Sequence, residues 1–170
     1  AGRRLAWGKF LNSGQTCIAP DYALVDKSVK DELVKYIQAS ITDFYGSDPS
    51  TSPDYARIIN DRHFGRLTAL IDSGSVLIGG QHDGSTRFIA PTVLDGISGD
   101  SAVMQEEIFG PILPLITVDS SDEAIAFINE RDKPLALYVF AQDDKVIDRV
   151  LDQTSSGGVC VNGVILQVAA

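Results

Sequence analysis

One cysteine of the sequence lies in a setting suited to nucleophilic chemistry. Cys17 follows a polar loop, residues 12–16, in which Gly14 permits a tight bend. Backbone N–H groups around such a loop can stabilise a thiolate, and also the oxyanion that forms when a thiol attacks a carbonyl. The loop alone leaves two interpretations open. Cys17 is a nucleophile, or it is a small buried apolar side chain, which is the commoner use of a free cysteine.

The remaining chemically versatile residues give weaker patterns. Cys160 alternates with valines in an expected strand, which predicts a buried sheet residue. His63 and His82 are nineteen residues apart without a cysteine or carboxylate at ligand spacing, so we expect no metal site. The glycines Gly79, Gly80 and Gly84 follow a strand but open no helix, which indicates a turn and not a dinucleotide-binding loop.

Helical and strand-like segments alternate along the chain and must position these residues. Ser28–Asp31 and Ser120–Glu123 both have the spacing of a helix capping box. Strands that alternate with helices imply βαβ units, so we expect an α/β fold with a mainly parallel sheet and helices on both faces. The expected helices cover residues 3–11, 29–44, 61–71, 143–151 and a segment from 120; the expected strands cover 22–25, 76–78, 89–94, 113–118, 135–140 and 159–164.

Length, composition and charge narrow the class of protein. The 170 residues fit one domain, and 44% apolar with 22% charged residues is typical of a globular chain. A net charge of −9 argues against a nucleic-acid partner. No apolar run approaches the length of a membrane span and no signal peptide is recognisable, so we expect a cytoplasmic protein. Two dissimilar cysteines do not suggest a disulfide framework.

Two separate motifs resemble the aldehyde dehydrogenase superfamily. The run FLNSGQTCIAPDY, Phe10 to Tyr22, resembles the superfamily's catalytic-cysteine signature. The run QEEIFGP, Gln105 to Pro111, resembles its EEIFGP motif and lies about ninety residues further on, as the family pattern expects. The resemblance extends over essentially the whole chain. Segments such as PDY, FYG, KPLALYVF and SSGG are similar to the class 3 branch.

The resemblance implies a catalytic role for Cys17. In that family the cysteine attacks an aldehyde to give a thiohemiacetal, hydride passes to a nicotinamide cofactor, and water hydrolyses the resulting thioester to the acid. Covalent catalysis suits this oxidation because the tetrahedral oxyanion expels hydride readily. The backbone N–H of Cys17 would supply half of the oxyanion hole. The cofactor is NAD or NADP, and the choice depends on a ribose contact outside this sequence.

The second motif implies two cofactor contacts. By resemblance, Glu107 accepts hydrogen bonds from the nicotinamide ribose and Phe109 lies beside the nicotinamide ring. From spacing alone, Glu106 and Glu107 would be a solvated acidic pair and Phe109 a core aromatic. Asn162 is a weaker candidate, since it would hold backbone near the substrate tunnel or serve the structure only.

Several family elements do not occur in the 170 residues. The glutamate general base of an ELGG-type motif, the asparagine of a WNYP-type motif and an LPFGG-type segment are missing, and so is the cofactor-binding domain. The apolar ending, residues 165–170, also suggests truncation. We therefore expect residues 1–170 to be the nucleophile-bearing catalytic domain, unable to turn over alone. The full-length protein would be a homodimer acting on a small aldehyde.

Two alternatives remain. The chain could be a non-catalytic interaction or structural module of the same fold. It could also derive from an acylating dehydrogenase that passes the acyl group to coenzyme A, although the class 3 features argue against this.

Overall fold

The computed structural model describes residues 1–168, so Ala169 and Ala170, the end of the apolar stretch 165–170, lie outside the described residues. The longer helices are α1 (Gly2–Phe10), α2 (Lys30–Tyr45), α3 (Asp61–Leu70), α4 (Ser121–Asn129) and α5 (Asp144–Gln153). Short 3₁₀ turns span Leu11–Gly14, Pro49–Thr51, Ile71–Ser73, Ala102–Met104 and Leu166–Val168. The strands are β1 (Ala23–Asp26), β2 (Ser75–Ile78), β3 (His82–Asp83), β4 (Phe88–Ile89), β5 (Thr92–Asp95), β6 (Ile112–Val118), β7 (Ala136–Val139) and β8 (Gly158–Val161).

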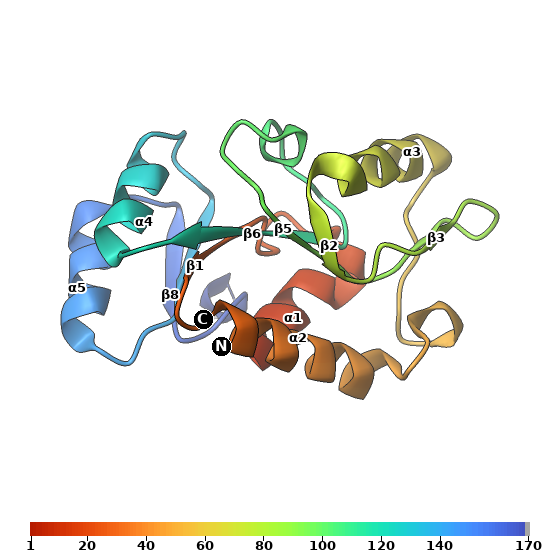
Figure 1. Cartoon of the computed structure of the whole chain (residues 1–170), viewed down its shortest axis with the longest axis horizontal. Helices are drawn as coiled ribbons and strands as arrows, with labels where there is room; N and C mark the ends of the chain where they lie inside the picture. Colours follow the sequence, from red (N-terminus) through yellow and green to blue (C-terminus); the bar gives the residue numbers. More distant parts are fainter. Residues whose placement is uncertain (169–170) are drawn as a thin grey trace.

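The main sheet has four strands in the order β1-β6-β5-β2 and crosses the centre of the molecule (Figure 1). The pairs β1·β6 and β5·β6 are parallel, whereas β2 pairs antiparallel with β5. Strand β6 is buried at every position except Thr117. A strand covered on both faces needs such a continuous apolar run.

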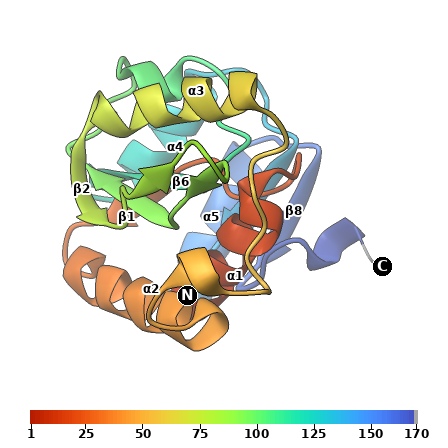
Figure 2. The same cartoon turned by 90° about the vertical axis from the view of Figure 1, so that its right-hand side faces the viewer.

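Helices cover both faces of this sheet. Alternate residues of β6 point to opposite faces and therefore pack in two different cores. Leu113 and Leu115 pack in one core with residues of α1 and α2. Ile112 and Ile116 pack in a second core with residues of α3. Figure 2 shows α3 above the sheet and α1 with α2 below it. The predicted α/β fold with helices on both faces is confirmed for this sheet.

The predicted mainly parallel sheet is confirmed for the main sheet, but four of the strands lie outside it. Strands β7 and β8 form a separate two-stranded parallel sheet, and β3 and β4 form a small antiparallel hairpin. The main sheet is mixed, mostly parallel, because the short connection from β2 through the hairpin returns the chain antiparallel beside its neighbour. Helices α4 and α5 pack beside β7 around Ile125, Val139 and Val150 (Figure 1).

The local predictions differ in detail. The expected strand 89–94 is split into β4 and β5, and the expected turn 79–86 contains β3. Ser120 caps α4 by accepting a hydrogen bond from the N–H of Glu123, as predicted. The capping box at Ser28 is wrong, since the hydroxyl of Ser28 instead donates to Asp26 and α2 begins without a side-chain cap. Of the helices in residues 1–168, none has both the length and the apolar character to cross a bilayer.

Candidate active site

The loop that precedes Cys17 has an unusual backbone. Asn12, Ser13 and Gly14 all have positive φ, at 51°, 51° and 72°. Glycine adopts this left-handed region without cost and asparagine tolerates it, whereas serine requires support from its surroundings. The buried hydroxyl of Ser13 provides part of that support by donating to the carbonyl of Ala56 at 2.6 Å. The chain therefore turns sharply just before the cysteine.

The amide of Gln15 fixes the rest of the loop. Its Nε2 donates to the carbonyl of Arg57 at 3.1 Å, and its Oε1 accepts from the N–H of Ile59 at 3.0 Å. Cys17 follows and is exposed, so the interpretation as a buried apolar residue is wrong. Within residues 1–168, no protein group accepts a hydrogen bond from the backbone N–H of Cys17. That N–H is free to stabilise an oxyanion beside the thiol.

The two sequence motifs meet in space. A Cβ atom at Gly14 would overlap the carbonyl group of Gly110, so only glycine allows the nucleophile loop to pack this closely against the second motif. A Cβ atom at Gly110 would in turn overlap the side chain of Leu67 on α3. Two glycines, 96 residues apart, thus let the nucleophile loop, the second motif and the side chain of Leu67 pack in direct contact. The proximity that the resemblance implies for the two motifs is present.

Within the second motif, one residue is buried in the core and its two neighbours are exposed to solvent. Ile108 is completely buried, whereas Glu107 and Phe109 are exposed. Phe109 has a φ of 51°, a conformation that bulky residues rarely adopt. Both the solvated acidic residue at 107 and the exposed ring at 109 are thus available to a ligand, and the alternative of Phe109 as a core aromatic is wrong.

The charge around Glu107 comes from groups that sequence inspection did not single out. Partial burial and, next, the carboxylate of Asp21 raise the pKa of Glu107, while Lys9 and Arg66 oppose this shift. Lys9 is only 1% exposed, and its burial lowers the pKa of its ammonium to about 8 against the opposing effect of Asp21 and Glu107. A lysine directly before the first motif and an aspartate inside it were the available signals.

The sheet β7–β8 approaches the nucleophile loop from another side. The hydroxyl of Tyr138 donates to the carbonyl of Ile18 at 2.6 Å. Cys160 pairs with Tyr138 across the sheet and is half-buried, so the prediction of a buried residue is only partly right. The two-stranded sheet leaves this face partly open, which explains the difference.

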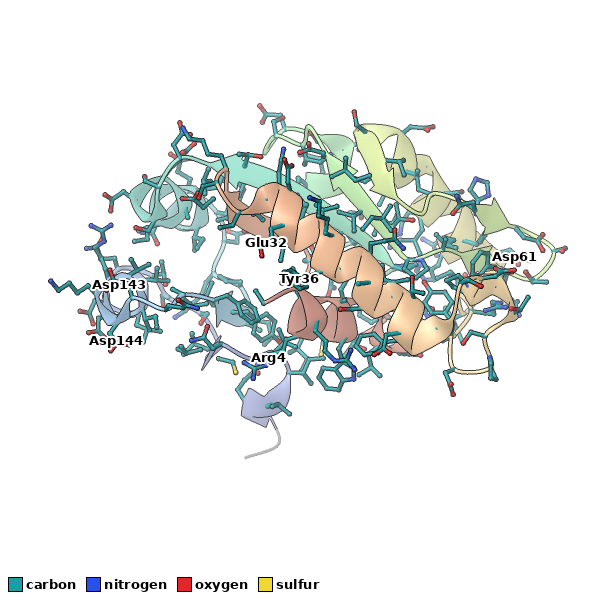
Figure 3. The ribbon with its side chains drawn as sticks, turned by 60° about the horizontal axis from the view of Figure 1, so that its bottom comes forward. Arg4, Glu32, Tyr36, Asp61, Asp143 and Asp144 are labelled. Atoms are coloured by element: carbon teal, nitrogen blue, oxygen red, sulfur yellow. The ribbon has the colours of Figure 1, made fainter. Side chains whose placement is uncertain are left out.

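The Asn162 side chain, directly after β8, bonds to the backbone of Ala141, just beyond the end of β7. Its Nδ2 donates to the carbonyl of Ala141 at 2.9 Å, and its Oδ1 accepts from the N–H of Ala141 at 3.2 Å. Arg4 on α1 donates to the backbone carbonyl of Asn162, and Figure 3 shows Arg4 beside the C-terminal segment. In this arrangement Asn162 holds backbone in place, while a small apolar hollow lined by Trp7 and Cys160 lies next to it.

The two histidines lie apart from these groups. His63 is exposed near the start of α3, where its backbone N–H donates to Asn60. His82 is exposed on β3, and its ring meets the edge of Phe64. Among residues 1–168 there is no cluster of three or more His, Cys, Asp or Glu side chains that could hold a metal ion.

Sequence comparisons identify related proteins. The model of the aldehyde dehydrogenase family matches residues 1–170. The dimeric NADP-preferring aldehyde dehydrogenase of Mus musculus is 58% identical over 168 residues, which are 99% of this chain and 37% of the mouse protein. Aldehyde dehydrogenase family 3 member A2 of the same species is 55% identical over 166 residues, 98% of this chain and 34% of that protein. The chain thus spans about a third of these relatives.

The fold comparison agrees with the sequence comparison. The structure described as the substrate-bound state of Staphylococcus aureus AldH superimposes with a TM-score of 0.97 at 48% identity, covering 99% of this chain and 37% of that one. Family model, relatives and fold all point the same way: the chain belongs to the aldehyde dehydrogenase family and is similar to its class 3 branch.

Proposed function

We propose that residues 1–170 are the nucleophile-bearing domain of a longer NAD(P)-dependent aldehyde dehydrogenase, in which Cys17 is the catalytic nucleophile. One observation carries the proposal. An exposed thiol stands at the end of a strained, tightly anchored loop, and that loop packs directly against the segment presenting Glu107 and Phe109. A nucleophile and a cofactor-facing carboxylate must be held together for hydride to leave one reactant and reach the other.

The chemistry of the thiol follows from its surroundings. The Sγ of Cys17, as thiolate, forms a bond to the aldehyde carbon, and the carbonyl π electrons move to oxygen. The free N–H of Cys17 donates to this oxyanion. Collapse of the oxyanion expels the aldehydic hydrogen with its electron pair and leaves a thioester. Attack of water on that thioester releases the carboxylic acid and restores the thiol.

The residues present suit a nicotinamide cofactor. Within residues 1–168 the carboxylate of Glu107 makes no hydrogen bond and is exposed, so it can accept from both hydroxyls of a ribose. The exposed ring of Phe109 offers a flat apolar surface beside it. When bound, NAD⁺ or NADP⁺ supplies the hydride acceptor. A mouse relative is described as NADP-preferring and dimeric, and we extend NAD(P) use and a dimeric state to the full-length protein by similarity.

The central test is carried out on the full-length protein. Aldehyde oxidation is followed by NAD(P)H formation, with a medium-chain and an aromatic aldehyde as substrates. Cys17→Ser should lower kcat by about 10³-fold or more, because the hydroxyl is a far weaker nucleophile. Cys160→Ser is the matched control and should stay within about twofold of the parent. Full activity of Cys17→Ser would favour a non-catalytic role for this domain.

A second test uses residues 1–170 alone. We expect no sustained NAD(P)H formation, because the general base and most of the cofactor site belong to motifs that this sequence lacks. Cys17 should nevertheless react with iodoacetamide well before Cys160, since only Cys17 is exposed. Peptide mapping of the alkylated chain measures the order. Equal rates would show that the loop does not present the thiol.

A further inference from the structure

The segment that presents Glu107 has no regular secondary structure to hold it. Residues 105–111 lie between the 3₁₀ turn Ala102–Met104 and the start of β6. Backbone N–H and C=O groups in such a segment need partners other than a helix or sheet ladder. Two charged side chains provide such partners: Asp21 accepts from an N–H group, and Arg66 donates to C=O groups.

Asp21 holds the N–H side of the segment. Its Oδ1 accepts a hydrogen bond from the backbone N–H of Ile108 at 3.0 Å. Asp21 stands four residues after Cys17, between the nucleophile loop and β1. A charged acceptor forms a stronger bond to a backbone N–H than a neutral one does. This hydrogen bond therefore connects Ile108, the residue next to Glu107, to the segment that follows Cys17.

Arg66 holds the C=O side. Its guanidinium donates to the carbonyls of Glu107 and Ile108 and to the carboxylate of Glu106, the last at 3.2 Å. The planar fork of an arginine suits several acceptors at once. The next residue on α3, Leu67, is fully buried and packs against Gly110. Arg66 is thus attached to a helix that cannot shift without opening the core.

Charges of both signs lie around this segment. Asp21 and Glu107 repel one another, whereas Lys9 and Arg66 are close enough to attract Glu107. Lys9, buried beneath, is also attracted to Asp21.

We propose that Asp21 and Arg66 are positioning residues that clamp the Glu107–Ile108 backbone through its N–H and C=O groups and so fix Glu107 relative to Cys17 for cofactor binding. The inference rests on the proposed function, because the clamp matters only if Glu107 holds the ribose. It assigns neither residue a contact with the cofactor. The proposal predicts that loss of either residue's hydrogen bonds weakens cofactor binding but does not change the reactivity of the Cys17 thiol in the absence of cofactor.

The experiment uses the full-length protein and compares Asp21→Ala with Asp21→Asn. Alanine removes the acceptor, whereas asparagine keeps an Oδ1 that can accept from Ile108. We expect Asp21→Ala to raise the Kd and KM for NADP⁺ about tenfold, from the loss of one charge-assisted hydrogen bond, with a smaller change in kcat. Asp21→Asn should restore most of the affinity. Asp48→Ala is the matched control, since Asp48 accepts a backbone N–H from Ser50 at 2.9 Å on an exposed turn elsewhere.

Arg66→Lys supplies an independent arm that keeps the charge. A single ammonium cannot span the same acceptors, so this variant should also raise the Kd for NADP⁺ several-fold. Binding is measured by fluorescence titration with NADPH, which needs no turnover. The rate of Cys17 alkylation without cofactor should stay within about twofold of the parent in both variants.

The outcomes separate the two proposals. If the unaltered protein does not oxidise aldehydes, the proposed function fails whatever the variants show. If it does, unchanged NADP⁺ affinity in both Asp21→Ala and Arg66→Lys overturns the clamp. Asp21→Asn binding as weakly as Asp21→Ala also overturns it, because the charge and not the hydrogen bond would then matter. Parallel loss of thermal stability, cofactor affinity and thiol reactivity would mark a general structural role and contradict the proposal.

Discussion

The four-stranded sheet and the two-stranded sheet β7–β8 hold different parts of the candidate site. The main sheet lies between two large cores, and the loops bearing Cys17 and Glu107 both enter its strands, β1 and β6. The smaller sheet packs on a core of three buried residues, and Val159 and Val161 on β8 remain exposed. A group that takes part in chemistry needs a rigid support, and the main sheet provides it.

The largest expected difference between the two sheets is in core energetics. Leu115→Ala in β6 should lower the free energy of unfolding by about 3–4 kcal/mol, because the leucine is fully buried and its neighbours cannot fill the space. Leu137→Ala in β7 is the matched change at a partly buried position and should cost about 1–2 kcal/mol. Urea unfolding of both variants gives the two values. Equal costs would break the comparison.

A glycine substitution tests how closely the two site loops must pack. Gly14→Ala should cost about 2–3 kcal/mol, from its positive φ together with the overlap with Gly110. Gly96→Ala is the control, since Gly96 has a φ of 70° and open space around it; about 1 kcal/mol is expected there. Urea unfolding of both variants supplies the comparison. If the two changes cost the same, the contact between the loops adds nothing to stability.

Lys9 makes the free energy of unfolding depend on pH, and its lowered pKa sets the direction of the change. Below about pH 8 the ammonium is charged in both states, so its burial penalty is fully present. Between about 8 and 10.5 the unfolded chain keeps the proton that the folded chain releases, so stability rises with pH. From pH 7 to 9.5 the unfolding free energy should rise by about 2 kcal/mol relative to Lys9→Met.

Chemical unfolding at the two pH values checks this, with Lys35→Met on the exposed face of α2 as the control. The ammonium of an exposed lysine stays in water in both states, so the control should follow the parent protein. A parent and a Lys9→Met variant with the same pH dependence would contradict the assignment to Lys9.

The smallest effect is expected where the two regions join. Tyr138→Phe removes the bond from β7 to the carbonyl of Ile18 and should cost about 1 kcal/mol. Because this bond reaches the residue next to Cys17, the alkylation rate of Cys17 should change as well. Tyr36→Phe on the exposed side of α2 should alter neither quantity. An unchanged alkylation rate in Tyr138→Phe would show that the smaller sheet does not position the thiol.

Most of the elements could be predicted because their signals are local. The continuous apolar run of β6 and the cap of α4 at Ser120 each depend on residues close in sequence. The separation of β7 and β8 from the main sheet could not be predicted, because strand pairing depends on contacts between distant segments. The cap at Ser28 failed for a local reason, since Asp26, two residues earlier, competes for its hydroxyl.

For the site, the sequence by itself determined the residue types and the two motifs, and their resemblance predicted roles for Cys17, Glu107 and Phe109. The tertiary structure decided that Cys17 and Phe109 are exposed, that Asn162 bonds to Ala141, and that Cys160 is half-buried. It alone identified Lys9, Asp21 and Arg66 as neighbours of Glu107. The physical reason is range: a motif records what one segment contains, whereas burial and charge depend on which distant segments fold against it.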